Sequence, residues 1–259
     1  MVYEIKSKYL KQFIKDIQHV NRNPENTKAL ELLNDKSTNP EVIILPKTKL
    51  YRSRIVDDES KIGKKPGFFG YDADGSFITP WQLARDMRAN YRYIPYLYCS
   101  NNPYTALIEV RPRLAAKVSI ATIQVKEKMT LLDFTIQNKP KKMSDAKFNL
   151  FKDLSYLFSK PISKDDDTLD YIPTQYIAEF AKKIGYDGII FSSSLTPEVN
   201  RKNLDRYNLV IFNHEKCHPI KSNLFQITHN YVDCNQIDDD LEQLIVKNRV
   251  EEELDNILA

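Results

Sequence analysis

The chain has little glycine: 6 residues among 259, and four of them fall in one stretch, 61–77. It contains neither a Walker-type phosphate loop nor the Gly-rich turn of dinucleotide-binding folds. If the protein binds a nucleotide, the phosphates must therefore be held by side chains rather than by a glycine-rich backbone loop. We expect the glycine-rich stretch itself to be a loop.

Cysteines and unbroken apolar runs are also scarce. The three cysteines (Cys99, Cys217 and Cys234) lack the paired spacing of a zinc site or a disulfide framework, so we expect reduced thiols and no metal. No apolar run is long enough to span a bilayer, and the N-terminus MVYEIKSKYLKQF interleaves charges, unlike a signal peptide. These features predict a cytoplasmic protein without membrane contact.

The charges are nearly balanced. Lys and Arg number 38 against 35 Asp and Glu, a net charge of +3, which does not indicate bulk or sequence-specific nucleic-acid binding. Hydrophobic content of 42% and charged content of 28% are typical of a globular protein with a sizeable core. The sequence leaves open whether the protein forms homo-oligomers.

Hydrophobic periodicity predicts a mixture of helices and strands. Apolar residues recur at helical spacing in 7–20, 27–34, 144–160 and 174–184, and a further short helix is predicted from Pro80 to Arg88. Asn26 is a plausible cap for the second helix. Strand patterns occupy 41–54 (on both sides of Pro46), 94–100, 117–125, 131–134, 188–191 and 208–212. This order, with few regular βαβ units, favours an α+β fold.

The predicted organisation has three parts. Residues 1–45 form an N-terminal helical segment, 46–220 a catalytic domain, and 221–259 a C-terminal helical tail. The tail carries an acidic amphipathic pattern from Asp238 to Leu258. The polar segment from Leu195 to Tyr207 is predicted to be a surface loop.

The segment from Arg88 to Pro112 is the richest in chemically useful side chains. It combines arginines, tyrosines and asparagines with a single carboxylate, Glu109, in a predicted strand, turn and short helix capped by Asn101 or Asn102. A lone acid near guanidinium groups and aromatic rings suits the binding of an anionic nucleotide. Composition alone favours the plainer interpretation, a strand–turn–helix with a solvated glutamate.

Four motifs in this chain, which occur in the order expected, resemble the RES-domain family. The central motif, which consists of Arg88-Ala-Asn90, the strand PYLYCS and Thr105-Ala-x-x-Glu109, resembles the core of the family. LYRSR (50–54) resembles its opening strand, and GYDGIIFSSS (185–194) with NLVIF (208–212) resembles its closing, serine-bearing elements. The resemblance spans about Lys49 to Cys217. It departs at Met87 and Tyr93, where the family often has glycine.

The resemblance implies an ADP-ribosyltransferase-like mixed sheet with N-terminal and C-terminal helices, and an enzyme that uses NAD as substrate without a cofactor. It implies cleavage of the nicotinamide–ribose bond, as an NAD glycohydrolase or phosphorylase. Arginine forks bind phosphate, tyrosine rings stack on bases, and a carboxylate stabilises an oxocarbenium-like transition state. The residues that the resemblance assigns to catalysis are Glu109, Arg52 and Ser192, and those that it assigns to NAD binding are Arg52, Arg88, Tyr98 and Ser192.

Neighbouring residues remain open alternatives for these roles. They are Arg54 for Arg52, then Arg85, Arg92 or Arg111 for Arg88, Tyr96 for Tyr98, and Ser194 for Ser192. Strand alternation predicts that Ser193 points to the opposite face. Two other functions stay open: ADP-ribosyl transfer to a protein or nucleic acid, and a non-catalytic nucleotide- or antitoxin-binding module. The resemblance also implies an Xre-like antitoxin as partner in a toxin–antitoxin pair.

Overall fold

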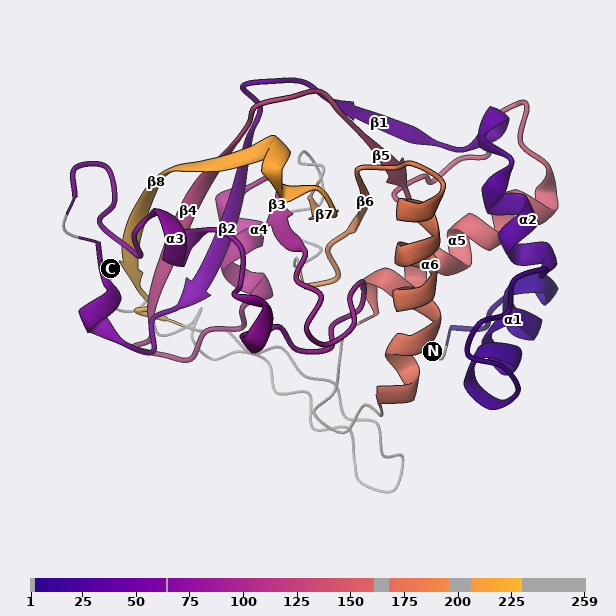
Figure 1. Cartoon of the computed structure of the whole chain (residues 1–259), viewed down its shortest axis with the longest axis horizontal. Helices are drawn as coiled ribbons and strands as arrows, with labels where there is room; N and C mark the ends of the chain where they lie inside the picture. The colour runs from indigo at the N-terminus through magenta and orange to yellow at the C-terminus, as the bar shows by residue number, and fades with distance from the viewer. Residues whose placement is uncertain (1–2, 64, 161–167, 196–205, 230–259) are drawn as a thin grey trace, which may run out of the picture.

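The computed structural model of the protein describes residues 3–63, 65–160, 168–195 and 206–229 (Figure 1). Its helices are α1 (Lys8–His19), α2 (Lys28–Asn34), α3 (Ala73–Ser76), α4 (Pro103–Glu109), α5 (Asp145–Ser159) and α6 (Ile172–Lys183). Its strands are β1 (Glu41–Ile44), β2 (Lys49–Ile55), β3 (Leu97–Ser100), β4 (Lys117–Val125), β5 (Met129–Asp133), β6 (Gly188–Ser192), β7 (Tyr207–Ile211) and β8 (Cys217–Gln226). This arrangement confirms the predicted α+β class.

All eight strands belong to one sheet, in the order β1-β5-β6-β7-β3-β2-β4-β8. The pair β5–β6 is parallel, and every other neighbouring pair is antiparallel. Pairing between β2 and β3 covers a single position, Tyr51 opposite Ser100, whereas β2 pairs with β4 over seven positions. The sheet therefore opens between β2 and β3.

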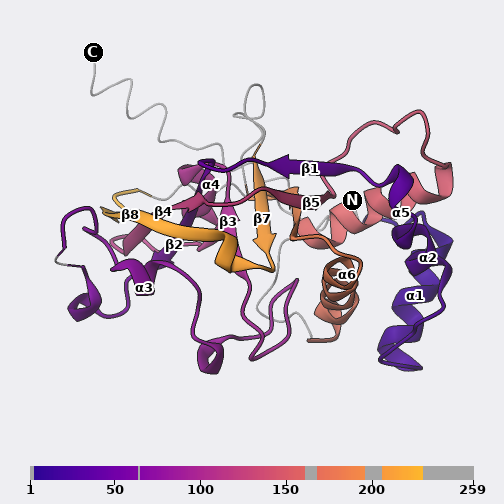
Figure 2. The same cartoon turned by 45° about the horizontal axis from the view of Figure 1, so that its top comes forward.

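Four helices cover one half of the sheet. We call α1, α2, α5 and α6 the helical layer; they gather at one end of the molecule, and Figure 2 shows α1 and α6 beneath β1 and β5. Successive residues of the central strands alternate between two cores. In β6, Ile189 packs in the core that includes the helical layer, and Ile190 packs in the core on the opposite face.

Short polar side chains start the helices. Ser7 accepts a hydrogen bond from the Leu10 N–H at the start of α1, and Asn102 caps α4, with Pro103 in its first turn. The cap of α2 is Thr27, so the prediction of Asn26 was wrong by one position. Gly185, with φ of +94°, follows the end of α6 in the left-handed conformation that glycine adopts without strain.

Two predicted boundaries and one predicted helix differ from the structure. The stretch from Pro80 to Arg88 contains only a single 3₁₀ turn, Trp81–Leu83, and the rest is loop held by backbone bonds between Met87 and Asn90. β1 lies before residue 46 and β8 runs past residue 220, so the sheet crosses both predicted segment boundaries. Most of the predicted loop after Leu195 and the whole acidic C-terminal helix lie outside the described residues.

Candidate active site

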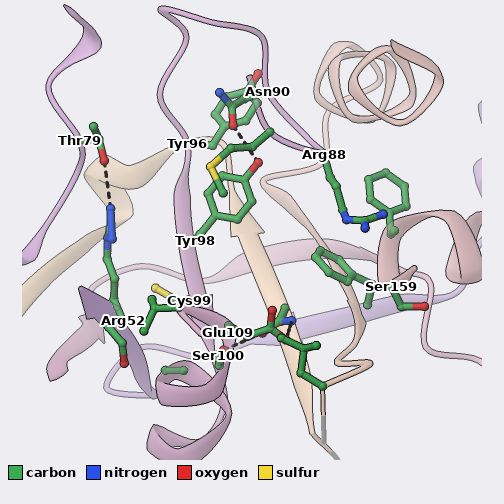
Figure 3. Close-up of a pocket in the computed structure, with 18 of the residues that line it drawn as sticks. Arg52, Thr79, Arg88, Asn90, Tyr96, Tyr98, Cys99, Ser100, Glu109 and Ser159 are labelled. Carbon is green, nitrogen blue, oxygen red and sulfur yellow. Dashed lines mark hydrogen bonds between the residues drawn. The ribbon is translucent and has the colours of Figure 1, made fainter. Parts of the chain in front are cut away.

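A cavity of about 640 Å³ lies where β3 and β6 end and β7 begins, beside the opening between β2 and β3. Its volume is in the range of small-molecule sites. The structure brings all five predicted site residues to its walls: Arg52, Arg88, Tyr98, Glu109 and Ser192. They come from five separate parts of the chain, and Figure 3 draws Arg52 and Arg88 on opposite sides, with Tyr98 and Glu109 between them.

Arg52 extends from β2 into the cavity wall. Its Nε donates to the Phe77 carbonyl at 2.9 Å, and its Nη2 donates to Thr79 Oγ1 at 3.1 Å (Figure 3). Arg54, the open alternative, donates to the same Thr79 oxygen at 2.8 Å and to the Gly75 carbonyl at 2.7 Å, but it does not line the cavity. One threonine thus holds two guanidinium groups side by side, with Arg52 on the cavity side.

Neither of these two cations is in an ion pair within the part of the chain that the structure describes, because no carboxylate there comes within ion-pair distance of Arg52 or Arg54. Burial, together with the positive charge of Arg54, lowers the pKa of Arg52 to about 10, and burial also lowers the pKa of Arg54. Among the described residues, Arg52 donates to carbonyl and hydroxyl oxygens, and a desolvated guanidinium with such partners favours the binding of an external anion such as phosphate.

Arg88 and Tyr98 form another wall. An Nη1 hydrogen bond joins Arg88 to the Leu157 carbonyl in the last turn of α5. The Tyr98 hydroxyl donates to Asn90 Oδ1 at 2.8 Å and accepts from the Ala89 N–H at 3.2 Å. Burial raises the pKa of Tyr98, so its hydroxyl stays protonated at neutral pH. The asparagine of the Arg-x-Asn motif therefore fixes the ring that shares the cavity with the motif's arginine.

Some of the open alternatives also line the cavity. Tyr96 does so, because strand alternation sends it to the same side as Tyr98; its hydroxyl donates to Glu179. Arg85 and Arg111 line the wall as well. Arg92 does not line it, and its guanidinium lies over the Tyr93 ring, 5.0 Å from the centroid.

Glu109 is the last residue of α4 and is only partly exposed. Its Oε1 accepts a hydrogen bond from Ser193 Oγ at 2.6 Å and another from Asn208 Nδ2 at 2.7 Å. The two donors come from the end of β6 and from β7, so two separate strands fix the place of the carboxylate at the cavity wall. Three chain segments thus meet at one oxygen atom.

The serines after Phe191 follow strand alternation. Ser192 and Ser194 both line the cavity, which leaves the choice between them open, and Ser193 is not among the lining residues. Alternation places Ser193 on the same face as Phe191, whose partner across β7 is Asn208. Ser193 and Asn208 both donate to Glu109, a contact that the prediction did not foresee.

Sequence reasoning missed three asparagine and serine side chains of this site. Asn90 and Asn208 are buried and bind Tyr98 and Glu109, and Ser100 binds Asn208 (Figure 3). Each residue carries a weak signal in the sequence. Ser100 and Asn208 are polar residues at the ends of apolar strands, and Asn90 belongs to the Arg-x-Asn motif. Their roles depend on which strands are neighbours, and local patterns do not reveal that.

The described residues contain no group of three or more His, Cys, Asp or Glu side chains that could hold a metal ion. Within the same residues, no helix has both the length and the apolar character needed to cross a membrane. The polar lining of the cavity consists of arginines, tyrosines, serines and asparagines with Thr79, Cys99, Lys160 and two carboxylates, Asp86 and Glu109.

The family model of the RES domain matches residues 66–231, more than half of the chain, so the chain belongs to the RES domain family. The match includes Arg88, Tyr98, Glu109 and Ser192 and begins after Arg52. No curated protein matches the chain. Among solved structures, it is similar to the crystal structure of the M. tuberculosis MbcT–MbcA toxin–antitoxin complex. Identity is 14%, coverage is 78% of this chain and 93% of that one, and the TM-score is 0.39, too distant to indicate function.

Proposed function

We propose that this RES-domain chain consumes NAD by breaking the bond between nicotinamide and ribose. The observation that carries the proposal is one cavity with two chemically different walls. One wall presents the Glu109 carboxylate, anchored by two donors, and another presents Arg52, a partly buried guanidinium that forms no ion pair with any carboxylate of the described residues. A dinucleotide offers a match to both, because it carries a pyrophosphate and a ribose carbon that becomes cationic on cleavage.

Each wall has a defined task in this reaction. The pyrophosphate binds Arg52 and Arg88 through charge-assisted hydrogen bonds, which offset the cost of keeping these cations out of water. Tyr98 provides a flat ring for the nicotinamide or its ribose. As the C–N bond breaks, its electron pair leaves with neutral nicotinamide, and the ribose C1 becomes oxocarbenium-like; the Glu109 carboxylate stabilises that positive charge.

The acceptor then bonds to the same carbon. Water gives ADP-ribose and a proton, as in a glycohydrolase, and inorganic phosphate gives ADP-ribose-1″-phosphate, as in a phosphorylase. Ser192 lies on the cavity wall, where its hydroxyl can orient the acceptor or the ribose. The proposal covers both acceptors as one reaction class.

A partner belongs to the same proposal. An enzyme that depletes NAD must be silenced in its host, and family membership favours an Xre-like antitoxin for this task. A partner carboxylate placed against Arg52 and Arg88 would occupy the site of the pyrophosphate. Inducible expression of the chain alone should then arrest bacterial growth while cellular NAD falls, and expression of Glu109→Gln should not.

The direct test uses purified protein and NAD, with nicotinamide followed by chromatography and Glu109→Gln as the control. Release of nicotinamide by the parent chain alone is the expected result. A rate that rises with inorganic phosphate identifies a phosphorylase, and a phosphate-independent rate with free ADP-ribose identifies a glycohydrolase. Equal, background-level release by both proteins would contradict the proposed function.

A further inference from the structure

Asn208 occupies a buried position between two other side chains of the site. It lies in β7 directly opposite Ser100 of β3, and its exposed fraction is 8%. Its Oδ1 accepts a hydrogen bond from Ser100 Oγ at 2.6 Å, and its Nδ2 donates to Glu109 Oε1 at 2.7 Å. An amide has one acceptor end and one donor end, so turning it over here would set its oxygen against Glu109 Oε1 and lose the bond to the carboxylate.

The hydrogen bonds to Glu109 are unequally divided between its two oxygens. Ser193 Oγ and Asn208 Nδ2 both donate to Oε1, and no described residue donates to Oε2. One oxygen is therefore anchored to the sheet, and the other is left for contacts on the cavity side that Glu109 lines (Figure 3). A carboxylate stabilises a developing charge best when it is already in place and need not reorganise.

We propose that Asn208 and Ser100 are positioning residues that hold Glu109 with Oε2 free for the reacting carbon of the substrate. The proposal rests on the NAD-cleaving function proposed above. Asn208 acts through its N–H, which can only donate and so requires an acceptor oxygen opposite it. Ser100 acts one step further back: its hydroxyl donates to Oδ1 and holds the amide in place while Nδ2 faces Glu109.

The order of activity among three variants tests this assignment. Asn208→Ala and Ser100→Ala should each lower kcat for nicotinamide release, the former by about tenfold or more, with little change in KM, because Glu109 acts mainly in the transition state. Asn208→Asp fills the same space but sets a second carboxylate against Glu109, so it should lower kcat further than Asn208→Ala. If Asn208 had only a structural role, Asn208→Asp would keep a higher kcat than Asn208→Ala. That order, or a parental kcat in folded Asn208→Ala, overturns the proposal.

Asn39 provides a matched control. It is a partly buried asparagine whose Nδ2 donates to the Leu33 carbonyl at 2.8 Å and to the Tyr186 hydroxyl at 3.1 Å, and it does not line the cavity. Asn39→Ala should lower the melting temperature while leaving kcat within about twofold of the parent. An equal loss of kcat in this control would assign the effect to general loosening of the fold and overturn the positioning role.

A measurement independent of turnover separates this proposal from the proposed function. In protein labelled with ¹³C at glutamate carboxyls, the signal that Glu109→Gln removes should change its chemical shift at neutral pH in Asn208→Ala but not in Asn39→Ala, because only Asn208 donates to that carboxylate. The substitution leaves the other charged groups of the cavity in place: Arg52, Arg85, Asp86, Arg88, Arg111 and Lys160. An unchanged chemical shift in Asn208→Ala overturns the positioning role whether or not NAD is cleaved. A changed chemical shift without nicotinamide release supports the anchoring of Glu109 and contradicts only the NAD reaction.

Discussion

Charged side chains in α5 and in β2 differ in the partners that the described chain gives them. Asp153 in α5 is fully buried and accepts hydrogen bonds from the Tyr3 hydroxyl at 2.7 Å and from the N–H groups of Lys6 and Ser7 at 3.0 and 2.6 Å. Arg52 in β2 is partly buried and donates to a carbonyl and a hydroxyl oxygen. Among the described residues, three donors satisfy the first charge, and no carboxylate pairs with the second.

The difference indicates what each charge is for. A buried charge costs free energy unless the chain supplies its partners, and Asp153 uses its partners to hold the N-terminal segment against α5. Lys147, on the same helix, is 2% exposed and donates to the Asp35 carbonyl and to Thr38 Oγ1. A cation left without an anion lowers stability, and its retention is explained where a ligand supplies the missing charge. Substitutions at the two kinds of charge should therefore affect different measurements.

The largest effect on stability is expected at Asp153. Asp153→Ala removes the acceptor of three hydrogen bonds and leaves the Ser7 N–H buried without a partner, so the free energy of unfolding in urea should fall by about 3 to 4 kcal/mol. The kcat of the folded fraction should stay within twofold of the parent. Asp145→Ala, in the same helix but with a side chain 84% exposed, is the control and should change stability by less than ~0.5 kcal/mol. Equal losses of unfolding free energy in Asp153→Ala and Asp145→Ala would show that the buried hydrogen bonds of Asp153 add no more stability than an exposed carboxylate does.

Glu109→Gln should show the opposite pattern. The substitution keeps the shape and removes the negative charge that stabilises the transition state, so kcat should fall by at least ~100-fold, equivalent to about 2.7 kcal/mol. Affinity for ADP-ribose and the free energy of unfolding should change little, since the Ser193 hydroxyl and the Asn208 amide can still bind the side-chain oxygen. Near-parental turnover in the folded variant excludes Glu109 from catalysis.

Arg52→Met should separate binding from stability. The affinity for ADP-ribose, measured by calorimetry, should fall roughly 10- to 100-fold with the loss of charge-assisted bonds to phosphate. The free energy of unfolding should stay within ~1 kcal/mol of the parent, because the substitution removes a partly buried cation, which has no carboxylate partner among the described residues, along with its hydrogen bonds. Arg54→Met is the matched control, and its effect on affinity should be smaller because Arg54 does not line the cavity. Equal affinity losses in the two variants would place both guanidinium groups at the ligand.

Local patterns predicted most of the scaffold. The helices of the helical layer follow from apolar periodicity, because their buried positions repeat at helical spacing. The strand at 117–125 follows from its run of β-branched and apolar residues, which is buried almost continuously. β8 was missed because it is an edge strand with most of its residues partly or fully exposed, so no alternation marks it. The predicted helix at Pro80 to Arg88 was wrong because backbone bonds in the cavity loop take the place of helical ones.

The site was predictable only as far as its motifs extend. Resemblance named the residues that line the cavity, but the bonds that fix them cross between strands distant in sequence. Asn208 reaches Glu109 only because β7 lies between β3 and β6, an arrangement set by the whole sheet. Ser193 contacts Glu109 because α4 sets that carboxylate on the face of β6 and β7 that also carries Asn208. Long-range register, rather than composition, decides which polar side chains meet.

The smallest expected effect is a difference in stability that arises from backbone strain at Tyr93, in the loop beside the cavity. The position compared with it is Lys15 in α1, which belongs to the helical layer. Tyr93, where the family often has glycine, has φ of +70°, a conformation that is costly for residues with a Cβ. Its ring lies edge-on to Trp81, with centroids 6.2 Å apart, and that contact offsets part of the strain. Tyr93→Ala keeps the strain and loses the ring, whereas Tyr93→Gly loses both. The glycine variant should therefore be the more stable of the two, by about 1 kcal/mol in urea unfolding.

The same pair of substitutions at Lys15, an exposed position within α1, should give the opposite sign. There the backbone is helical, so Lys15→Gly should be less stable than Lys15→Ala by about 1 kcal/mol. An alanine preference at both positions would mean that Tyr93 is not strained in solution. A reversal of sign between the two positions would show that the backbone at Tyr93 is strained in solution, and that the ring contact with Trp81 offsets only part of that strain.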